Sequence, residues 1–176
     1  MSRAEAKSWA LAELARAAAA GPVPVVIDAE VAAFSRLAGM APGNVTFSGM
    51  LESVAHGPLA GRPRLHGEVT AAVTLACQRC LEPMPVSVAA QVDAPFVDGA
   101  QDDGGGDAWP VDDRVRFGEV VEEFVLLALP MVALHAAEDC GAEIRPEFDA
   151  SPAAARRSPF AGLGSLVAGE RGGKKN

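Results

Sequence analysis

The residues with the clearest chemical potential are three cysteines and one histidine, which fall into two pairs. Cys77 and Cys80 form a CxxC motif within the stretch TLACQRCLEP, residues 74–83, and His135 and Cys140 form the second pair. Thiolate sulfur and imidazole nitrogen are the donors that tetrahedral zinc prefers, and a Cys-x2-Cys spacing is typical of half a zinc site. These four residues are therefore the candidate metal ligands, and zinc is the candidate ion.

Two other interpretations of the same residues stay open. A catalytic CxxC pair needs a thiol with a lowered pKa, which a helix N-terminus usually provides. Pro83 and Pro85 follow the motif here, so a helix is not expected where that chemistry would need one. Alternatively, the cysteines pack as small apolar side chains at a hairpin end. Because 54 residues separate Cys80 from His135, only the tertiary fold can unite the two pairs.

Other residue types give weaker chemical signals. His56 lies in a Gly-Pro turn and His66 on the polar face of an expected strand, where a histidine is usually solvated. The sequence contains no GxSxG, HExxH or phosphate-binding Gly-x4-Gly-Lys motif. We therefore predict no catalytic residue, no covalent catalysis, no cofactor other than zinc, and no small-molecule substrate that the sequence identifies.

The composition is that of a globular protein in a reducing compartment. A chain of 176 residues with 49% apolar residues can bury the core of one domain. Its net charge of −8 disfavours non-specific attraction to nucleic-acid phosphates. The three cysteines do not form the even set of a secreted disulfide framework. The longest apolar run, residues 124–137, is too short to span a membrane, so we expect a soluble, cytoplasmic protein with no membrane partner.

The elements that must position the two pairs are strands and one main helix. Apolar and polar residues alternate in four expected strands, at residues 23–28, 45–54, 64–76 and 86–97. The CxxC motif lies at the connection between the last two, which we expect to be antiparallel neighbours. An amphipathic helix is expected at residues 10–20. The main helix is expected at residues 118–129, where the glutamates fall largely opposite the apolar face and Pro130 ends the helix.

These elements predict a single α+β domain over residues 1–150, with an antiparallel curved sheet or partial barrel covered by one main helix. Residues 98–113 are rich in Gly and Asp and predict a flexible acidic loop. Residues 151–176 are predicted to form a low-complexity basic tail. Its cations are Arg156, Arg157, Arg171, Lys174 and Lys175.

Three blocks of the sequence resemble the YceD family of large ribosomal RNA subunit accumulation proteins. They are GEVTAAVTLACQRCLEP (67–83), FGEVVEEFVLLALPMVALHAAEDC (117–140) and SPFAGLGSL (158–166). The middle block is the most specific, with an acidic helix, a Leu-Pro stop, a histidine and a cysteine in that order. Ser158 stands where the family commonly has asparagine.

The resemblance implies a function that the composition does not show. It implies a non-enzymatic ribosome-biogenesis factor that supports accumulation or processing of large-subunit ribosomal RNA. The implied partner is the precursor of that RNA or a ribosome-assembly protein. A zinc-dependent or thiol-dependent enzyme of unknown substrate is the alternative.

Overall fold

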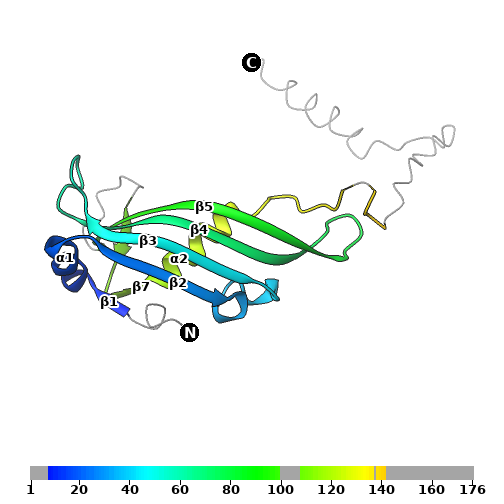
Figure 1. Ribbon diagram of the computed structural model, residues 1–176, viewed down its shortest axis with the longest axis horizontal. Coiled ribbons are helices and arrows are strands. Elements are labelled where there is room, and N and C mark those ends of the chain that lie inside the picture. Colours follow the sequence, from blue (N-terminus) through cyan, green and yellow to red (C-terminus); the bar gives the residue numbers. More distant parts are fainter. Residues whose placement is uncertain (1–7, 100–107, 137, 142–176) are drawn as a thin grey trace, which may run out of the picture. The chain divides into compact units, whose positions relative to one another are not determined.

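The computed structural model describes residues 8–99, 108–136 and 138–141, and it contains one five-stranded sheet with two helices on the same face (Figure 1). The strands of the main sheet are β2 (Val23–Glu30), β3 (Asn44–Ser53), β4 (Pro63–Ala76), β5 (Pro83–Asp98) and β6 (Trp109–Val111). The smaller elements are β1 (Ser8–Ala10), α1 (Leu11–Ala20), η1 (Val31–Ala33), η2 (Ala38–Met40), β7 (Arg114–Arg116) and α2 (Phe117–Ala128).

The strand order is β2-β3-β4-β5-β6, and the predicted α+β class is confirmed. The first four strands are antiparallel neighbours, as expected, and the sheet is open. The sheet differs from the prediction in its last strand, because β6 pairs with β5 in parallel and makes the sheet mixed. A second, two-stranded sheet pairs β1 with β7. That pairing places Ala10, the residue before α1, opposite Arg114, and Arg116, the residue before α2, opposite Ser8.

The acidic loop is shorter than the range predicted for it, residues 98–113, because the ends of that range belong to strands. Residues 109–111 form β6, and Val111 is buried in the core. Trp109 packs against the same core, so apolar anchors at the end of the range give it a strand. Residues 100–107 and the predicted basic tail, residues 151–176, lie outside the described residues.

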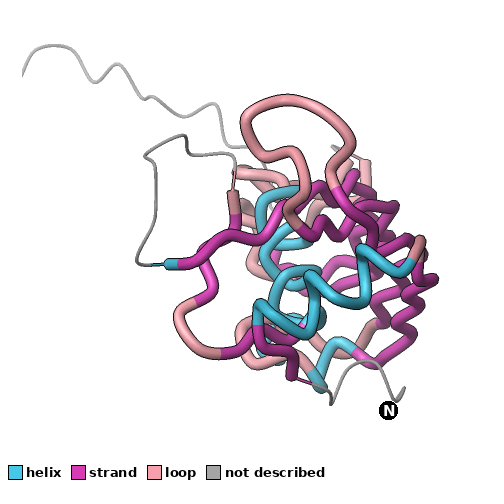
Figure 2. Tube along the Cα trace, turned by 90° about the vertical axis from the view of Figure 1, so that its left-hand side faces the viewer, coloured by secondary structure: helices cyan, strands magenta, loops and turns pink. Residues whose placement is uncertain are grey.

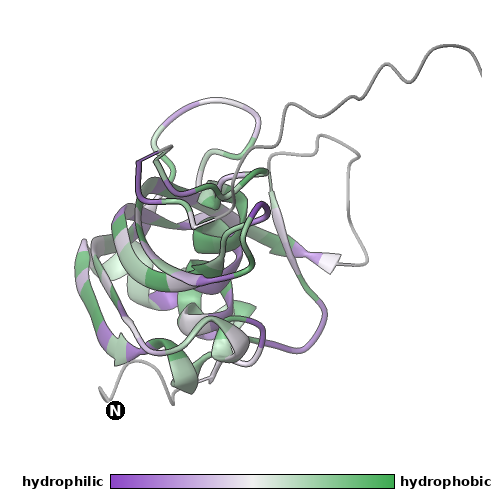
Figure 3. Ribbon diagram, turned by 90° about the vertical axis from the view of Figure 1, so that its right-hand side faces the viewer, coloured by the Kyte–Doolittle hydropathy of each residue, from purple (hydrophilic) through white to green (hydrophobic). Residues whose placement is uncertain are grey.

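The core lies between one face of the main sheet and the two helices. Alternation along the strands places Ile27, Phe47 and Val69 side by side on that face, and all three are buried. Figure 3 shows the alternation as hydrophobic and hydrophilic bands along the strands. Both helices contribute to this core, α1 through Leu14 and α2 through Val121 among others. Figure 2 shows the helices on one side of the sheet.

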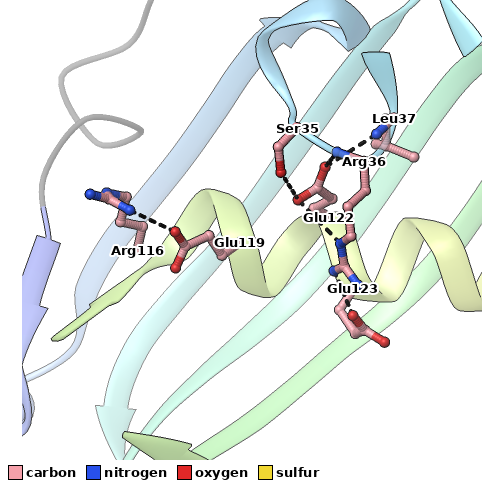
Figure 4. A network of polar contacts seen from close by, with 7 residues as sticks. All are labelled: Ser35, Arg36, Leu37, Arg116, Glu119, Glu122 and Glu123. Atoms are coloured by element: carbon pink, nitrogen blue, oxygen red, sulfur yellow. Dashed lines mark hydrogen bonds and ion pairs between the residues drawn. The ribbon is translucent and has the colours of Figure 1, made fainter. Parts of the chain in front are cut away.

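Glu122 is an exception to the predicted pattern of α2, because its side chain is 4% exposed although it was expected on the face opposite the apolar one. Its Oε1 accepts backbone N–H bonds from Arg36 at 2.6 Å and Leu37 at 3.2 Å, and its Oε2 accepts the Ser35 hydroxyl at 3.4 Å (Figure 4). A buried carboxylate is tolerated when donors surround it in this way. Glu122 therefore ties the segment between η1 and η2 to α2.

Candidate metal centre

The CxxC motif occupies the turn between β4 and β5, at a hairpin tip that extends beyond the rest of the sheet. The last β4 residue that pairs with β3 is Ala72, so among the strands of the described residues only β5 pairs with residues 73–76. Two backbone bonds close the turn: the Cys77 N–H donates to the Glu82 carbonyl at 2.9 Å, and the Leu81 N–H donates to the Cys77 carbonyl at 2.8 Å. The two closing bonds hold both cysteines of the motif in one tight turn.

The segment that follows α2 is hydrogen-bonded to this turn. α2 ends at Ala128, and Pro130 prevents the helix from continuing. The backbone N–H of Gln78 donates to the Ala133 carbonyl at 2.9 Å, and the side-chain amide of Gln78 donates to the Met131 carbonyl at 3.2 Å. These bonds place His135 beside the CxxC turn. Nothing in the residue type of Gln78 signalled this role in the sequence.

The four predicted ligands converge in the structure. One ligand atom from each of Cys77, Cys80, His135 and Cys140 lies within 4.8 Å of the others. The Cys77 and Cys140 sulfurs are 4.0 Å apart, and the Cys80 sulfur lies 3.3 Å from Nδ1 of His135. The prediction that the fold unites the two pairs is therefore confirmed.

The spacing of these atoms fits a tetrahedral zinc ion. Zinc–sulfur bonds of about 2.3 Å and zinc–nitrogen bonds of about 2.0 Å place two sulfurs about 3.8 Å apart and a sulfur and a nitrogen about 3.5 Å apart. The distance of 4.0 Å between the Cys77 and Cys140 sulfurs and that of 3.3 Å between the Cys80 sulfur and His135 Nδ1 are close to these values, and the ligand atoms all lie within 4.8 Å of one another. Three soft sulfur donors with one imidazole favour zinc over calcium or magnesium, which prefer oxygen ligands. The residues present therefore fit zinc.

The electrostatics of the cluster favour a thiolate at Cys77. The backbone N–H of Cys80 lowers the pKa of the Cys77 thiol to about 5, assisted by the backbone N–H groups of His135 and Arg79, although burial opposes the shift. The backbone N–H of His135 donates directly to the Cys77 sulfur, at an N···S distance of 3.4 Å. Metal binding requires deprotonated thiols, so the lowered pKa of Cys77 favours binding of a cation at this residue.

The second thiol of the motif has the opposite tendency. The Glu82 backbone N–H lowers the pKa of the Cys80 thiol, but burial and the neighbouring Cys77 and Cys140 side chains outweigh it, so the pKa is raised. A thiolate at Cys77 disfavours a second negative charge on the neighbouring Cys80. A bound divalent cation would remove that conflict.

The structure also bears on the two other interpretations of the cysteines. Cys77 is fully buried and follows a strand, whereas redox-active cysteines are usually accessible and often lie at a helix N-terminus. Simple packing of the cysteines requires burial alone, and it gives no reason for four ligand atoms to face one another. Both observations favour a metal site. The other histidines lie outside the cluster, and Nε2 of His66 is 3.0 Å from a carboxylate oxygen of Glu52.

Leu81 supplies a backbone conformation that the turn requires and that leucine disfavours. Its φ is +64°, and its side chain is 76% exposed. The left-handed region costs a non-glycine residue about 1–2 kcal/mol, and glycine adopts it freely but loses about 0.5–1 kcal/mol of chain entropy on folding. We expect Leu81→Gly to raise the free energy of unfolding by about 0.5 kcal/mol, as measured by urea denaturation. Leu81→Val is the control and should lower it, since a β-branched residue fits this region worst.

One comparison with known protein families matches the part of the chain that contains this cluster. The family model described as large ribosomal RNA subunit accumulation protein YceD matches residues 65–167, which is more than half of the chain. The chain belongs to the YceD family. The matched span of this YceD protein includes β4 from residue 65 onward, β5, α2 and all four residues of the Cys/His cluster. No curated protein and no solved structure matches the chain.

The match confirms the resemblance found in the sequence and associates the family with accumulation of large-subunit ribosomal RNA. The family description names an accumulation protein and no catalytic activity. Among the helices in the described part of the chain, none is long and apolar enough to cross a membrane.

Proposed function

We propose that this YceD protein is a non-enzymatic ribosome-biogenesis factor that supports accumulation or processing of large-subunit ribosomal RNA. The observation that carries the proposal is the family match over residues 65–167, which spans the Cys/His cluster and the elements that build it. Its partner is the precursor RNA or a ribosome-assembly protein, and its place of action is the cytoplasm.

The geometry of the cluster supports a structural role for zinc rather than a catalytic one. Catalytic zinc sites keep a position open for water or substrate beside three protein ligands, whereas structural sites use four protein ligands. Here Cys77, Cys80, Cys140 and His135 supply four donors. Zinc would then join the β4–β5 turn to the segment after α2 and leave no position for a substrate. A zinc-dependent enzyme is correspondingly less well supported.

Loss of the gene is expected to lower the ratio of large-subunit to small-subunit ribosomal RNA. The physical reason is that precursor RNA left without an assembly factor stays unpackaged for longer and is open to nucleases. The measurement is the ratio of the two mature RNAs during rapid growth in a deletion strain, with the intact gene restored as the control. An unchanged ratio would contradict the proposed function.

The direct partner is decided by crosslinking and purification from growing cells, followed by sequencing of RNA and identification of proteins. Enrichment of large-subunit precursor RNA with direct protein–RNA crosslinks indicates an RNA partner. If nuclease treatment removes the RNA and the other proteins but one assembly protein stays bound, the direct partner is that protein. The net charge of −8 favours the second outcome, because it gives the chain no general attraction to phosphate.

A further inference from the structure

β5 has a long unpaired edge. On one side, β4 pairs with residues 83–95 of β5. On the other side, β6 pairs only with residues 96–98. In the part of the chain that the structure describes, the outer edge of β5 from residue 83 to residue 95 therefore has no strand partner, and every second backbone N–H and C=O along it is available for hydrogen bonding.

This edge lacks the protection that edge strands usually carry. Natural sheets block their edges with charged residues and prolines, which prevents pairing with other chains. The opposite edge strand, β2, carries Pro24, Asp28 and Glu30. In β5 the run VSVAAQV, residues 86–92, contains neither a charge nor a proline. Prolines occur only at the two ends of the unpaired stretch, and its one charged residue, Asp93, is held in an ion pair with Arg64 of β4, which leaves residues 86–94 as a continuous strand template.

The side chains along the same stretch form two different rows. Val86, Val88 and Ala90 lie on the core-facing side, but they are only half-buried although they pack against the core. Ser87 and Ala89 lie on the other side and are exposed. A strand added beside β5 would cover the half-buried apolar row with its own alternate side chains, because residues of neighbouring strands lie side by side on each face.

The charges of the sheet indicate what kind of strand would be added. The exposed face next to this edge carries the carboxylate of Glu68, which lies opposite Gln91 in the register, and no ion pair holds Glu68 among the described residues. Asp28 and Glu30 are exposed on the same face, further from the edge. Two copies of a chain of net charge −8 repel each other, whereas a lysine- or arginine-bearing segment is attracted.

We propose that residues 86–94 of β5 are a docking site for an extended segment of a partner protein, which joins the main sheet as an additional strand. The segment alternates apolar residues, which cover Val86, Val88 and Ala90, with basic or polar residues on the exposed face. This mode of recognition combines main-chain hydrogen bonds with alternate side-chain contacts. The proposal does not rest on the role in ribosomal RNA accumulation.

The test uses hydrogen exchange of the full chain with a synthetic peptide as the probe. The peptide is acetyl-KVTVKVTVK-amide, which alternates valine with lysine or threonine, and a scrambled peptide of the same composition is the control. Docking predicts slower exchange at residues 86–94 and unchanged exchange at residues 23–30 of β2, since only the β5 edge lacks protection. The scrambled peptide should leave both segments unchanged.

Two variants separate the effect of blocking the β5 edge from the effect of adding a charge to the protein. Val88→Lys puts a charge in the row that the added strand must cover and should weaken peptide binding about tenfold. Ala89→Lys adds the same charge on the exposed face and should bind more tightly than Val88→Lys. Exchange in β3 and β4 checks that both variants are folded, and the footprint on the unmodified chain stands whether or not Val88→Lys folds.

Three outcomes would overturn the proposal. The first is peptide binding with no protection at residues 86–94, or no binding at all. The second is equal binding to Val88→Lys and the unmodified chain. The third is protection of residues 86–94 that rises with protein concentration in the absence of peptide, because the occupant would then be a second copy of this chain.

Discussion

Replacing Cys77 with serine is expected to abolish zinc binding and to loosen the tip of the β4–β5 hairpin. Cys77 is the buried ligand of the cluster, and its sulfur lies 4.0 Å from that of Cys140. A hydroxyl is a poor replacement for a thiolate as a zinc ligand. Because structural metal binding contributes directly to folding free energy, the variant should unfold at a lower temperature. Metal analysis should show about one zinc per chain in the unmodified protein and none in the variant.

The controls for this experiment separate metal binding from packing. His66→Asn changes a histidine outside the cluster and should keep its zinc. Both proteins are purified without chelator and without nickel, so that the metal content is that acquired in the cell. If the cysteines only pack against one another, the unmodified protein will contain no zinc and Cys77→Ser will cause only a small loss of stability. That result would end the zinc hypothesis.

Replacing Glu122 with alanine is expected to lower the free energy of unfolding by about 3 kcal/mol. The substitution leaves the backbone N–H groups of Arg36 and Leu37 without their acceptor, and an unsatisfied buried donor costs about 1–3 kcal/mol. The segment between η1 and η2 should also become less tightly held to α2, where the ion pair between Arg36 and Glu123 remains. Urea denaturation measures the loss, and hydrogen exchange at residues 34–37 shows where it occurs.

Two other variants define the cause of this loss. Glu122→Gln keeps an oxygen that can accept both N–H bonds, so it should cost about 1 kcal/mol or less. Glu119→Ala removes a carboxylate from the same helix, but Glu119 is exposed and bound only to Arg116 in Figure 4, so its loss should cost less than about 1 kcal/mol. Equal losses of unfolding free energy for Glu119→Ala and Glu122→Ala would show that the buried hydrogen bonds of Glu122 contribute no more to stability than an exposed ion pair.

Regular periodicity made most of the main sheet predictable. The alternation of apolar and polar residues located four strands within a few residues of their observed bounds, because each strand has one face on the core and one in solvent. Pro130 located the end of α2, because it removes a backbone donor and restricts the residue before it. These are local properties, so the amino-acid order is enough to determine them.

Long-range contacts were decided only by the tertiary structure. β6 pairs with β5 in parallel through three residues, too few for a periodic signal. Glu122 looked like a surface residue, because its N–H donors come from a segment more than 80 residues away in the chain.

The Cys/His cluster combines both kinds of information. The sequence by itself determined the four donor types and their grouping into two pairs, and therefore the metal that would suit them. Only the fold decided that the pairs meet, because the Gln78 bonds to Met131 and Ala133 bring the segment after α2 to the hairpin tip. The bond to Ala133 joins two backbone groups and the bond to Met131 ends on a backbone carbonyl, and because nearly every residue carries such groups, the sequence alone cannot indicate which of them will pair.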